Sequence, residues 1–467
     1  MADSQDYLAT KKKLAEVSPS LCLAKWQQVT IYLQNGHTHS CHHPSSHRVP
    51  EAEIAAHPDA LHNSNFKMQR RKEMLEGKRP TECDYCWKIE DISPTLMSDR
   101  MLKSGEDWAM PELDKIKNHP WDWRVSPTYV EVSFSSTCNF KCAYCNPNSS
   151  TKWMEEIKEK GPYPTSGNYN NLDHLRSERK LPIPESDPNP YVEAFWKWWP
   201  ELYETLKVFR ITGGEPLLNK NTWRVFEHIE KYPKADLDFA VNSNLGVPTK
   251  MIEQFAEKLA AITENRNVRH FSIFTSVDTW GDQASYIRYG MDFEQYWKNV
   301  RYVLSKIKDT QLVFMCTFNA LSMPSIEKLF QGVAELKKEF GPNPVSGRPR
   351  VILDLPYLRS PAFLSAKILP QEFAQNLENC VKIVEDNMAP GLFYEMELNK
   401  AQRLLKWFKD PVDPAWLVHN RADFYRFITA YDQRRGTKFG QTFPQFENFL
   451  KVCQAETLRQ QGFSEGP

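Results

Sequence analysis

Residues 138–145 read Cys138-Asn139-Phe140-Lys141-Cys142-Ala143-Tyr144-Cys145 and follow an alternating apolar run at 129–134 (YVEVSF). The spacing places three thiols on one short loop. Structural zinc sites normally close with four protein ligands, so a lone group of three cysteines fits zinc poorly. Iron–sulfur clusters are held mainly by cysteine thiolates, and three thiolates leave one iron of a four-iron cubane without a protein ligand. The loop therefore indicates an iron–sulfur cluster with one open iron.

Short apolar or alternating runs recur along the chain, separated by stretches long enough for helices. They lie at 129–134, 208–211, 237–241, 271–277, 312–318 and 351–355. Six strands alternating with helices predict an α/β fold with a parallel sheet, open or curled into a partial barrel. Ligands of such sheets bind at the carboxyl ends of the strands. The segments that carry chemistry follow strands here, which predicts one shared site.

The cysteine loop and the downstream stretch Thr212-Gly213-Gly214-Glu215-Pro216 together resemble the radical SAM family over roughly residues 125–370. The resemblance implies a partial (β/α)6 barrel in which Cys138, Cys142 and Cys145 hold a 4Fe–4S cluster. S-adenosylmethionine (SAM) then chelates the open iron and is reductively cleaved to a 5′-deoxyadenosyl radical, which abstracts hydrogen from a substrate. The resemblance also implies an electron donor such as flavodoxin or ferredoxin.

The glycine-rich stretch has a SAM-binding role by the same resemblance. Gly213 and Gly214 permit close backbone approach, and Glu215 offers a carboxylate to the ammonium of the methionine part. The structural alternative is a turn before a helix.

The resemblance implies that four more residues contact SAM. Ser276 and Asp278 form a Ser-x-Asp element similar to the family's ribose-contacting strand, with a strand-end turn as the alternative. Arg288 is expected to clamp the methionine carboxylate, with a surface ion pair as the alternative. Tyr144 is expected beside the adenine. No residue receives a catalytic role.

A second group of cysteines, Cys22, Cys41, Cys83 and Cys86, precedes the barrel. A strand-like run over 26–33 ends at Asn35-Gly36, the preferred hairpin turn, and a helix over 66–76 leads to the Cys-x-x-Cys pair. Four thiols can close a metal site completely. Their order resembles a Twitch domain, a shortened SPASM domain, which implies an auxiliary 4Fe–4S cluster. Such domains commonly follow the barrel, and structural zinc remains the alternative.

The chain is expected to divide into three parts. These are a cysteine-rich α+β unit at 1–120, the partial barrel at 121–370 and a helical accessory region at 371–467. A section at 161–192, rich in Pro, Asn, Ser and charge, predicts a surface insertion or lid. Cys316, Cys380 and Cys453 are expected to be buried core thiols.

The 467 residues include 59 basic and 59 acidic side chains, so the formal net charge is zero. This balance disfavours a protein that collects nucleic acid or anionic membrane by charge alone. No run approaches the about 18 apolar residues of a membrane-spanning helix, and the start lacks a signal-peptide pattern. We expect a cytoplasmic protein.

The leading hypothesis is a radical SAM enzyme that acts on a peptide or protein side chain, because proteins with Twitch or SPASM domains often do so. A small metabolite, sugar or nucleotide is the second substrate class. The alternative of another kind is a non-catalytic zinc or iron–sulfur binding interaction protein.

Overall fold

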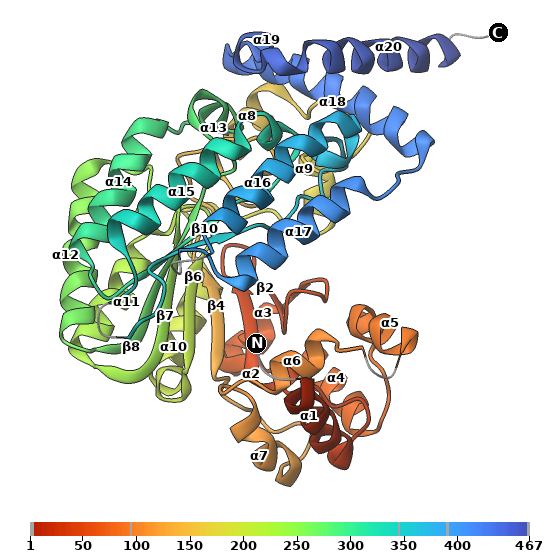
Figure 1. The fold of residues 1–467 in the computed structure, drawn as a ribbon. Helices are drawn as coiled ribbons and strands as arrows, with labels where there is room; N and C mark the ends of the chain where they lie inside the picture. Colours follow the sequence, from red (N-terminus) through yellow and green to blue (C-terminus); the bar gives the residue numbers. More distant parts are fainter. Residues whose placement is uncertain (1–3, 94–95, 344–345, 389–391, 465–467) are drawn as a thin grey trace. The chain divides into compact units, whose positions relative to one another are not determined.

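The computed structural model describes residues 4–93, 96–343, 346–388 and 392–464, grouped into two compact units (Figure 1). Unit 1 contains residues 1–136, 182–216 and 234–240. Unit 2 contains residues 137–181, 217–233 and 241–467. The cysteine loop therefore begins unit 2, whereas the four N-terminal cysteines belong to unit 1. The three-part division expected from the sequence stays a prediction.

Nine strands of the described chain form a sheet in the hydrogen-bonded order β11-β10-β8-β7-β6-β4-β1-β2-β3. Their bounds are β1 Gln28–Tyr32, β2 His37–His39, β3 His47–Arg48, β4 Tyr129–Ser133, β6 Val208–Thr212, β7 Lys234–Ser243, β8 Val268–Ser276, β10 Gln311–Met315 and β11 Val351–Asp354. All six strands predicted from the alternating runs are confirmed. The pairs β4–β6, β8–β10 and β10–β11 are parallel, which confirms the α/β class with a largely parallel sheet.

The N-terminal hairpin is confirmed, and it extends the parallel sheet. Strand β1 lies parallel to β4, with Val29 opposite Val130 and Ile31 opposite Val132. These four side chains are buried on one face, so the two strands share a continuous apolar surface. The sequence did not predict this docking, because an alternating pattern says which face of a strand is buried but not which strand lies beside it.

Gly36 closes the hairpin in a conformation that only glycine adopts easily. Its φ is +74°, and a Cβ placed there would lie 2.1 Å from Cζ of the buried Tyr191. The Tyr191 hydroxyl donates to the Val49 carbonyl at 2.9 Å. The Asn35-Gly36 turn is thus fixed both by its backbone angles and by the helix packed against it.

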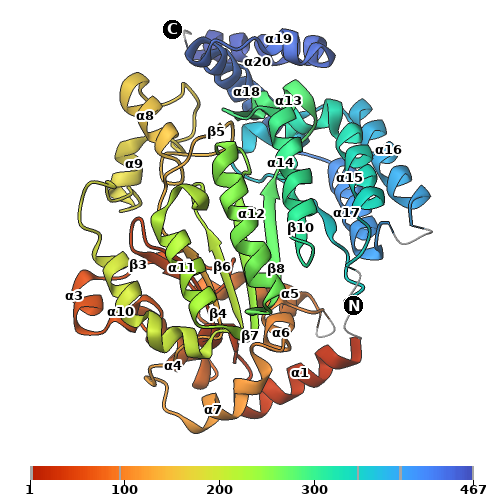
Figure 2. The ribbon, with the colours of Figure 1, turned by 90° about the vertical axis from the view of Figure 1, so that its left-hand side faces the viewer.

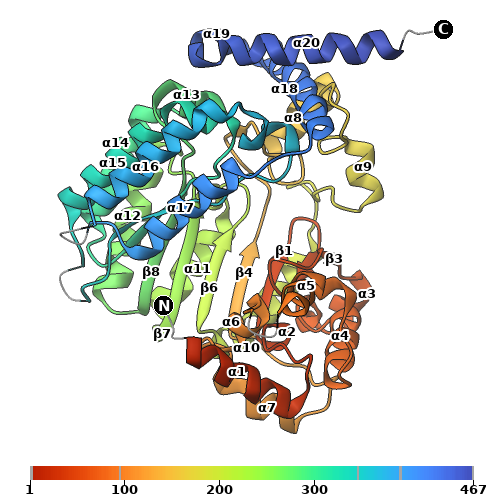
Figure 3. The same cartoon turned by 45° about the vertical axis from the view of Figure 1, so that its right-hand side comes forward.

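Helices of unit 1 surround these strands (Figure 3). Their bounds are α1 Ser4–Val17, α2 Ala24–Gln27, α3 Glu51–Ala56, α4 Asn65–Leu75, α5 Asp84–Ile92, α6 Asp99–Ser104, α7 Leu113–Asn118 and α10 Pro190–Thr205. Helix α10 covers the apolar face of the strands, with the rings of Trp199 and Phe209 centred 5.1 Å apart. Helix α4 confirms the helix predicted over 66–76, and Gly77 follows it with a φ of +78°.

Unit 2 is mostly helical outside its strands. Figure 2 shows α12 running alongside β8, with which it is in contact. The helices are α8 Thr151–Lys160, α9 Leu172–Ser177, α11 Lys220–Lys231, α12 Thr249–Glu264, α13 Gly281–Ile287, α14 Phe293–Lys306, α15 Ile326–Phe340, α16 Ala374–Asp386, α17 Glu395–Lys409, α18 Pro414–Arg435, α19 Phe439–Thr442 and α20 Glu447–Ser464. Helices α16 to α20 confirm the helical character predicted after residue 370. Within the described ranges, no helix is both long and apolar enough to cross a membrane.

Candidate active site

The three-cysteine loop is held at its centre by a short strand pair. Strand β5 (Lys141–Cys142) pairs antiparallel with β9 (Arg288–Tyr289), and Cys142 lies opposite Arg288. The next backbone amide, that of Ala143, donates to the Ile287 carbonyl at 2.7 Å. Cys138, Cys142 and Cys145 are half-buried thiols on this loop. The motif therefore sits against the segment that carries Arg288.

The ring of Phe140 packs closely against Gly246 and Gly290 and so holds the first half of the loop in place. Its ring is buried, and a Cβ added to Gly246 would lie 2.2 Å from its Cζ. A Cβ added to Gly290 would lie 3.1 Å from its Cδ1. Neighbouring Asn139 forms two side-chain hydrogen bonds. Its Nδ2 donates to the Gly246 carbonyl at 2.8 Å, and Asn244 Nδ2 donates to its Oδ1 at 2.9 Å. The loop is fixed at a residue between two of its cysteines.

Three residues predicted from the sequence, Tyr144, Asp278 and Arg288, meet in one buried cluster. Arg288 Nη2 donates to Asp278 Oδ1 at 3.0 Å, and Arg288 Nε lies 3.0 Å from Oδ2. The Tyr144 hydroxyl lies 3.1 Å from both carboxylate oxygens. The Thr317 amide donates to Oδ1 at 3.1 Å. Arg288 Nη1 also approaches Cys142 Sγ at 3.5 Å, so the cluster reaches a thiol of the loop.

The Arg288–Asp278 ion pair is buried, unlike the surface ion pair that was the alternative role expected for Arg288 from the sequence. Arg288 is 5% exposed and Asp278 is fully buried. Burial alone would lower the pKa of Arg288, but Asp278, Tyr144 and Cys142 together outweigh it and raise that pKa well above its usual range. The guanidinium is therefore permanently charged. Ser276 lies half-buried at the end of β8. The SAM contacts of these residues stay predictions.

The Gly213-Gly214-Glu215 turn is built inside unit 1. Gly213 has a φ of +126°, and a Cβ there would lie 2.7 Å from Ser133 Oγ and 2.8 Å from the Ser135 carbonyl oxygen. The Gly214 amide donates to the same carbonyl at 3.1 Å. Glu215 is only 1% exposed, although a plain surface turn would leave a carboxylate in water. The SAM contact of Glu215 stays a prediction.

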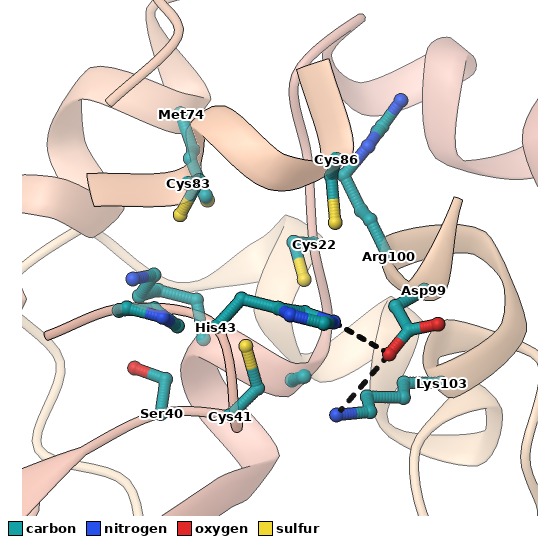
Figure 4. Close-up of a pocket in the computed structure, with 13 residues that line it drawn as sticks. Cys22, Ser40, Cys41, His43, Met74, Cys83, Cys86, Asp99, Arg100 and Lys103 are labelled. Carbon is teal, nitrogen blue, oxygen red and sulfur yellow. Dashed lines mark hydrogen bonds and ion pairs between the residues drawn. The ribbon is translucent and has the colours of Figure 1, made fainter. Parts of the chain in front are cut away.

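The four N-terminal cysteines line a single cavity of unit 1 (Figure 4). Cys22 precedes α2, Cys41 follows β2, and Cys83 and Cys86 lie at the start of α5. Burial raises the pKa values of Cys83 and Cys86 to about 12. Four thiols around one cavity are a donor set that fits a metal centre ligated by sulfur.

Cationic side chains surround this cavity. Lys25 is 2% exposed and forms an ion pair with Glu82. Arg100 is 5% exposed, and its Nη2 lies 2.7 Å from Glu90 Oε2. His43 Nε2 lies 2.7 Å from Asp99 Oδ2, and the His43 ring stacks on Tyr85 at 3.7 Å.

In the part of the chain that the structure describes, no three His, Cys, Asp or Glu side chains form a ready-made site for a single metal ion. The choice between an iron–sulfur cluster and structural zinc at the four thiols stays a prediction.

The sequence did not predict the side chains that hold the cysteine loop from outside. Trp153 Nε1 donates to the Cys142 carbonyl at 2.9 Å, and Arg435 Nη1 donates to the Lys141 carbonyl at 2.6 Å. Tyr169, from the 161–192 section, donates to the Ala143 carbonyl at 3.3 Å. No local pattern marks these residues, and the separation between donor and acceptor ranges from 11 to 294 residues.

Comparison with known proteins defines the class of this site. Residues 132–331 match the model of the Radical SAM superfamily, so this stretch is a radical SAM domain. The GTP 3′,8-cyclase of Nautilia profundicola is 28% identical over 131 residues, which are 28% of this chain and 30% of that protein. The GTP 3′,8-cyclase of Campylobacter lari is 29% identical over 116 residues, 25% of this chain and 27% of that protein. The chain thus spans less than a third of the length of these curated relatives.

Among solved structures, native anSMEcpe with bound AdoMet aligns with a TM-score of 0.35 and 17% identity, covering 55% of this chain and 60% of that one. The Radical SAM superfamily uses a 4Fe–4S cluster and SAM, and the assignment of Cys138, Cys142 and Cys145 as the cluster ligands stays a prediction. The Twitch resemblance of the N-terminal cysteines stays a prediction.

The Arg288–Asp278 pair gives the first prediction. Arg288→Met should lower the free energy of unfolding by about 3–5 kcal/mol, because it leaves a buried carboxylate without its cation. Adding Asp278→Asn to the same chain should recover a large part of this loss, since no uncompensated charge remains. Urea unfolding of the protein before cluster reconstitution measures both. Losses that simply add in the double variant would contradict a coupled pair.

Proposed function

We propose that this chain is a radical SAM enzyme that reductively cleaves SAM to a 5′-deoxyadenosyl radical and abstracts hydrogen from its substrate. One observation carries the proposal: Cys138, Cys142 and Cys145 lie as thiols on one anchored loop inside the radical SAM domain of residues 132–331. Three thiolates leave one iron of a cubane open to an exogenous ligand. When bound, the cluster supplies the electron that cleaves the sulfonium.

The surrounding residues have roles that follow from their chemistry. Arg288, next to Cys142 Sγ, offsets part of the negative charge that three thiolates bring into a buried site. The oxygens of Asp278 are engaged by Arg288, Tyr144 and the Thr317 amide. A ribose hydroxyl that contacts Asp278 would therefore have to replace one of these donors. Glu215 provides the carboxylate for the SAM ammonium in this proposal.

The four-cysteine cavity is the proposed site of an auxiliary 4Fe–4S cluster. Its support is the shared cavity of Cys22, Cys41, Cys83 and Cys86 together with the buried cations Lys25 and Arg100. A cluster with four thiolates carries net negative charge, and buried cations lower the cost of placing it there. Because all four irons would have protein ligands, this centre would serve electron transfer and leave SAM binding to the first cluster.

The substrate classes have different support. The matched relatives are named GTP 3′,8-cyclases, which favours a nucleotide for this chain as well. A peptide or protein side chain rests on the Twitch resemblance alone. We propose the nucleotide first, with a flavodoxin or ferredoxin as electron donor in the cytoplasm. Deuterium transfer from labelled GTP into 5′-deoxyadenosine would support it, and transfer only from a labelled peptide would favour the other class.

Loss of any ligand of the SAM cluster should abolish SAM cleavage. Cys138→Ala, Cys142→Ala and Cys145→Ala should each yield no 5′-deoxyadenosine after dithionite reduction, because each loses the cluster with the open iron. The matched control is Cys380→Ala, a core thiol that is 1% exposed, which should keep the product yield. Wild-type product from any of the three ligand variants would sink the assignment.

Removal of the second cysteine set should have a different effect. A variant with Ala at Cys22, Cys41, Cys83 and Cys86 should retain about half of the wild-type iron, since two four-iron clusters become one. SAM cleavage should persist at least in part. Iron and zinc analysis after anaerobic reconstitution measures the loss. Unchanged metal content would mean that the second site does not exist as described.

Glu215 tests the SAM site independently of iron. A charge-assisted hydrogen bond contributes about 1.5–3 kcal/mol, so Glu215→Gln should weaken SAM binding by roughly ten- to a hundred-fold at unchanged iron content. Isothermal titration of reconstituted protein with SAM measures the affinity, and a melting curve controls for folding. Unchanged affinity with a lower melting temperature would reduce Gly213-Gly214-Glu215 to a structural turn.

A further inference from the structure

The backbone carbonyls of the cysteine loop are held by side chains from three distant parts of unit 2. Each carbonyl accepts one side-chain hydrogen bond. The carbonyl of Cys138 accepts from Thr151 (3.4 Å), that of Phe140 from Ser150 (2.9 Å), that of Lys141 from Arg435 (2.6 Å), that of Cys142 from Trp153 (2.9 Å) and that of Ala143 from Tyr169 (3.3 Å). The donors come from the start of α8, from the 161–192 section and from the last residue of α18. The C-terminal region therefore reaches the loop directly.

Arg435 is itself fixed in this position. It is 7% exposed, and its Nε and Nη2 lie 3.1 and 3.3 Å from the two oxygens of Glu156 on α8. The guanidinium carbon lies 4.0 Å from the centre of the Tyr431 ring and 4.8 Å from that of Trp153. A planar guanidinium held by a carboxylate and two rings has little freedom, so Nη1 is aimed at the Lys141 carbonyl.

Fixing two neighbouring peptides fixes the side chain between them. Arg435 holds the peptide that precedes Cys142, and Trp153 holds the peptide that follows it. Each peptide is planar, so the only soft backbone angles between the two planes are φ and ψ of Cys142. With both planes anchored, these angles and the direction of the Cα–Cβ bond are set. The sulfur of Cys142 is thereby limited to the three staggered positions about a fixed Cα–Cβ bond.

We propose that Arg435 is a positioning residue for the cluster that binds SAM, and that the C-terminal helix α18 preorganises Cys142 for iron through it. The inference rests on the proposed function, because it needs a cluster at Cys138, Cys142 and Cys145. Residues around metal ligands typically change metal affinity by 10- to 100-fold when replaced. Loss of the Arg435 contact should therefore loosen the cluster without removing any ligand.

The test compares Arg435→Met with Arg434→Met in the full chain, both reconstituted anaerobically. Arg434 is the matched control: it is adjacent on α18, donates to the Gly161 and Pro162 carbonyls at 2.9 Å, and stacks on Tyr163 at 4.0 Å. Its contacts lie away from the cysteine loop, and it is half-buried where Arg435 is buried, so the melting curve separates lost packing from a loosened cluster. The readouts are the rate of iron loss to a chelator, the electron paramagnetic resonance (EPR) spectrum of the reduced cluster and a melting curve.

Arg435→Met should lose iron about ten-fold faster than wild type and broaden the EPR spectrum, whereas Arg434→Met should match wild type in both. Equal iron loss and equal spectra in wild type and Arg435→Met would overturn the inference. So would equal damage in the two variants, which would indicate helix packing alone. If Arg435→Met does not fold, Trp153→Phe decides, since it keeps a ring but removes the Nε1 donor, and wild-type iron retention there would overturn the inference. Failure of the wild type itself to take up iron would instead refute the proposed function.

Discussion

The antiparallel pairing of Lys141–Cys142 with Arg288–Tyr289 is the constraint on which the site depends. It brings a thiol of the loop beside a buried guanidinium that Asp278 and Tyr144 hold in place. A cluster ligated by three thiolates adds negative charge to a poorly solvated site, and a fixed cation nearby lowers that cost. The same short strand pair gives the centre of the loop a defined shape. On either side of it, the packing of Phe140 against Gly246 and Gly290 and the hydrogen bonds to the loop carbonyls hold the rest of the loop.

The clusters that we propose for the two cysteine sets would both bring negative charge into a buried site, with different numbers of protein ligands. In unit 1, Lys25 and Arg100 are buried beside four thiols, and each is also paired with a glutamate. In unit 2, Arg288 is buried beside a loop with three thiols and is paired with Asp278. Cations that already have partners hold their geometry before a cluster enters. The difference in function that we propose follows from the ligand count alone, because only the three-thiol loop leaves an iron open to SAM.

Local signals predicted much of this architecture, and long-range packing accounts for the rest. The six strands follow from alternation of apolar residues, and the hairpin and the α4 helix follow from Asn35-Gly36 and Gly77, which punctuate the chain locally. The motif cysteines were recognisable because all three lie within eight residues. Nothing local indicates that β1 pairs with β4. The contact of Arg435 with the Lys141 carbonyl spans 294 residues, and no spacing in the sequence encodes it.

The most direct measurement is the EPR spectrum of the dithionite-reduced, reconstituted protein with and without SAM. SAM that chelates an open iron changes the electronic surroundings of the cluster, so the account predicts a clear shift in the spectrum on addition of SAM. The shift should persist when the four N-terminal cysteines are replaced, because it belongs to the cluster at Cys138, Cys142 and Cys145. Spectra that are identical with and without SAM, or a reconstituted protein that contains zinc and no iron, would contradict the account.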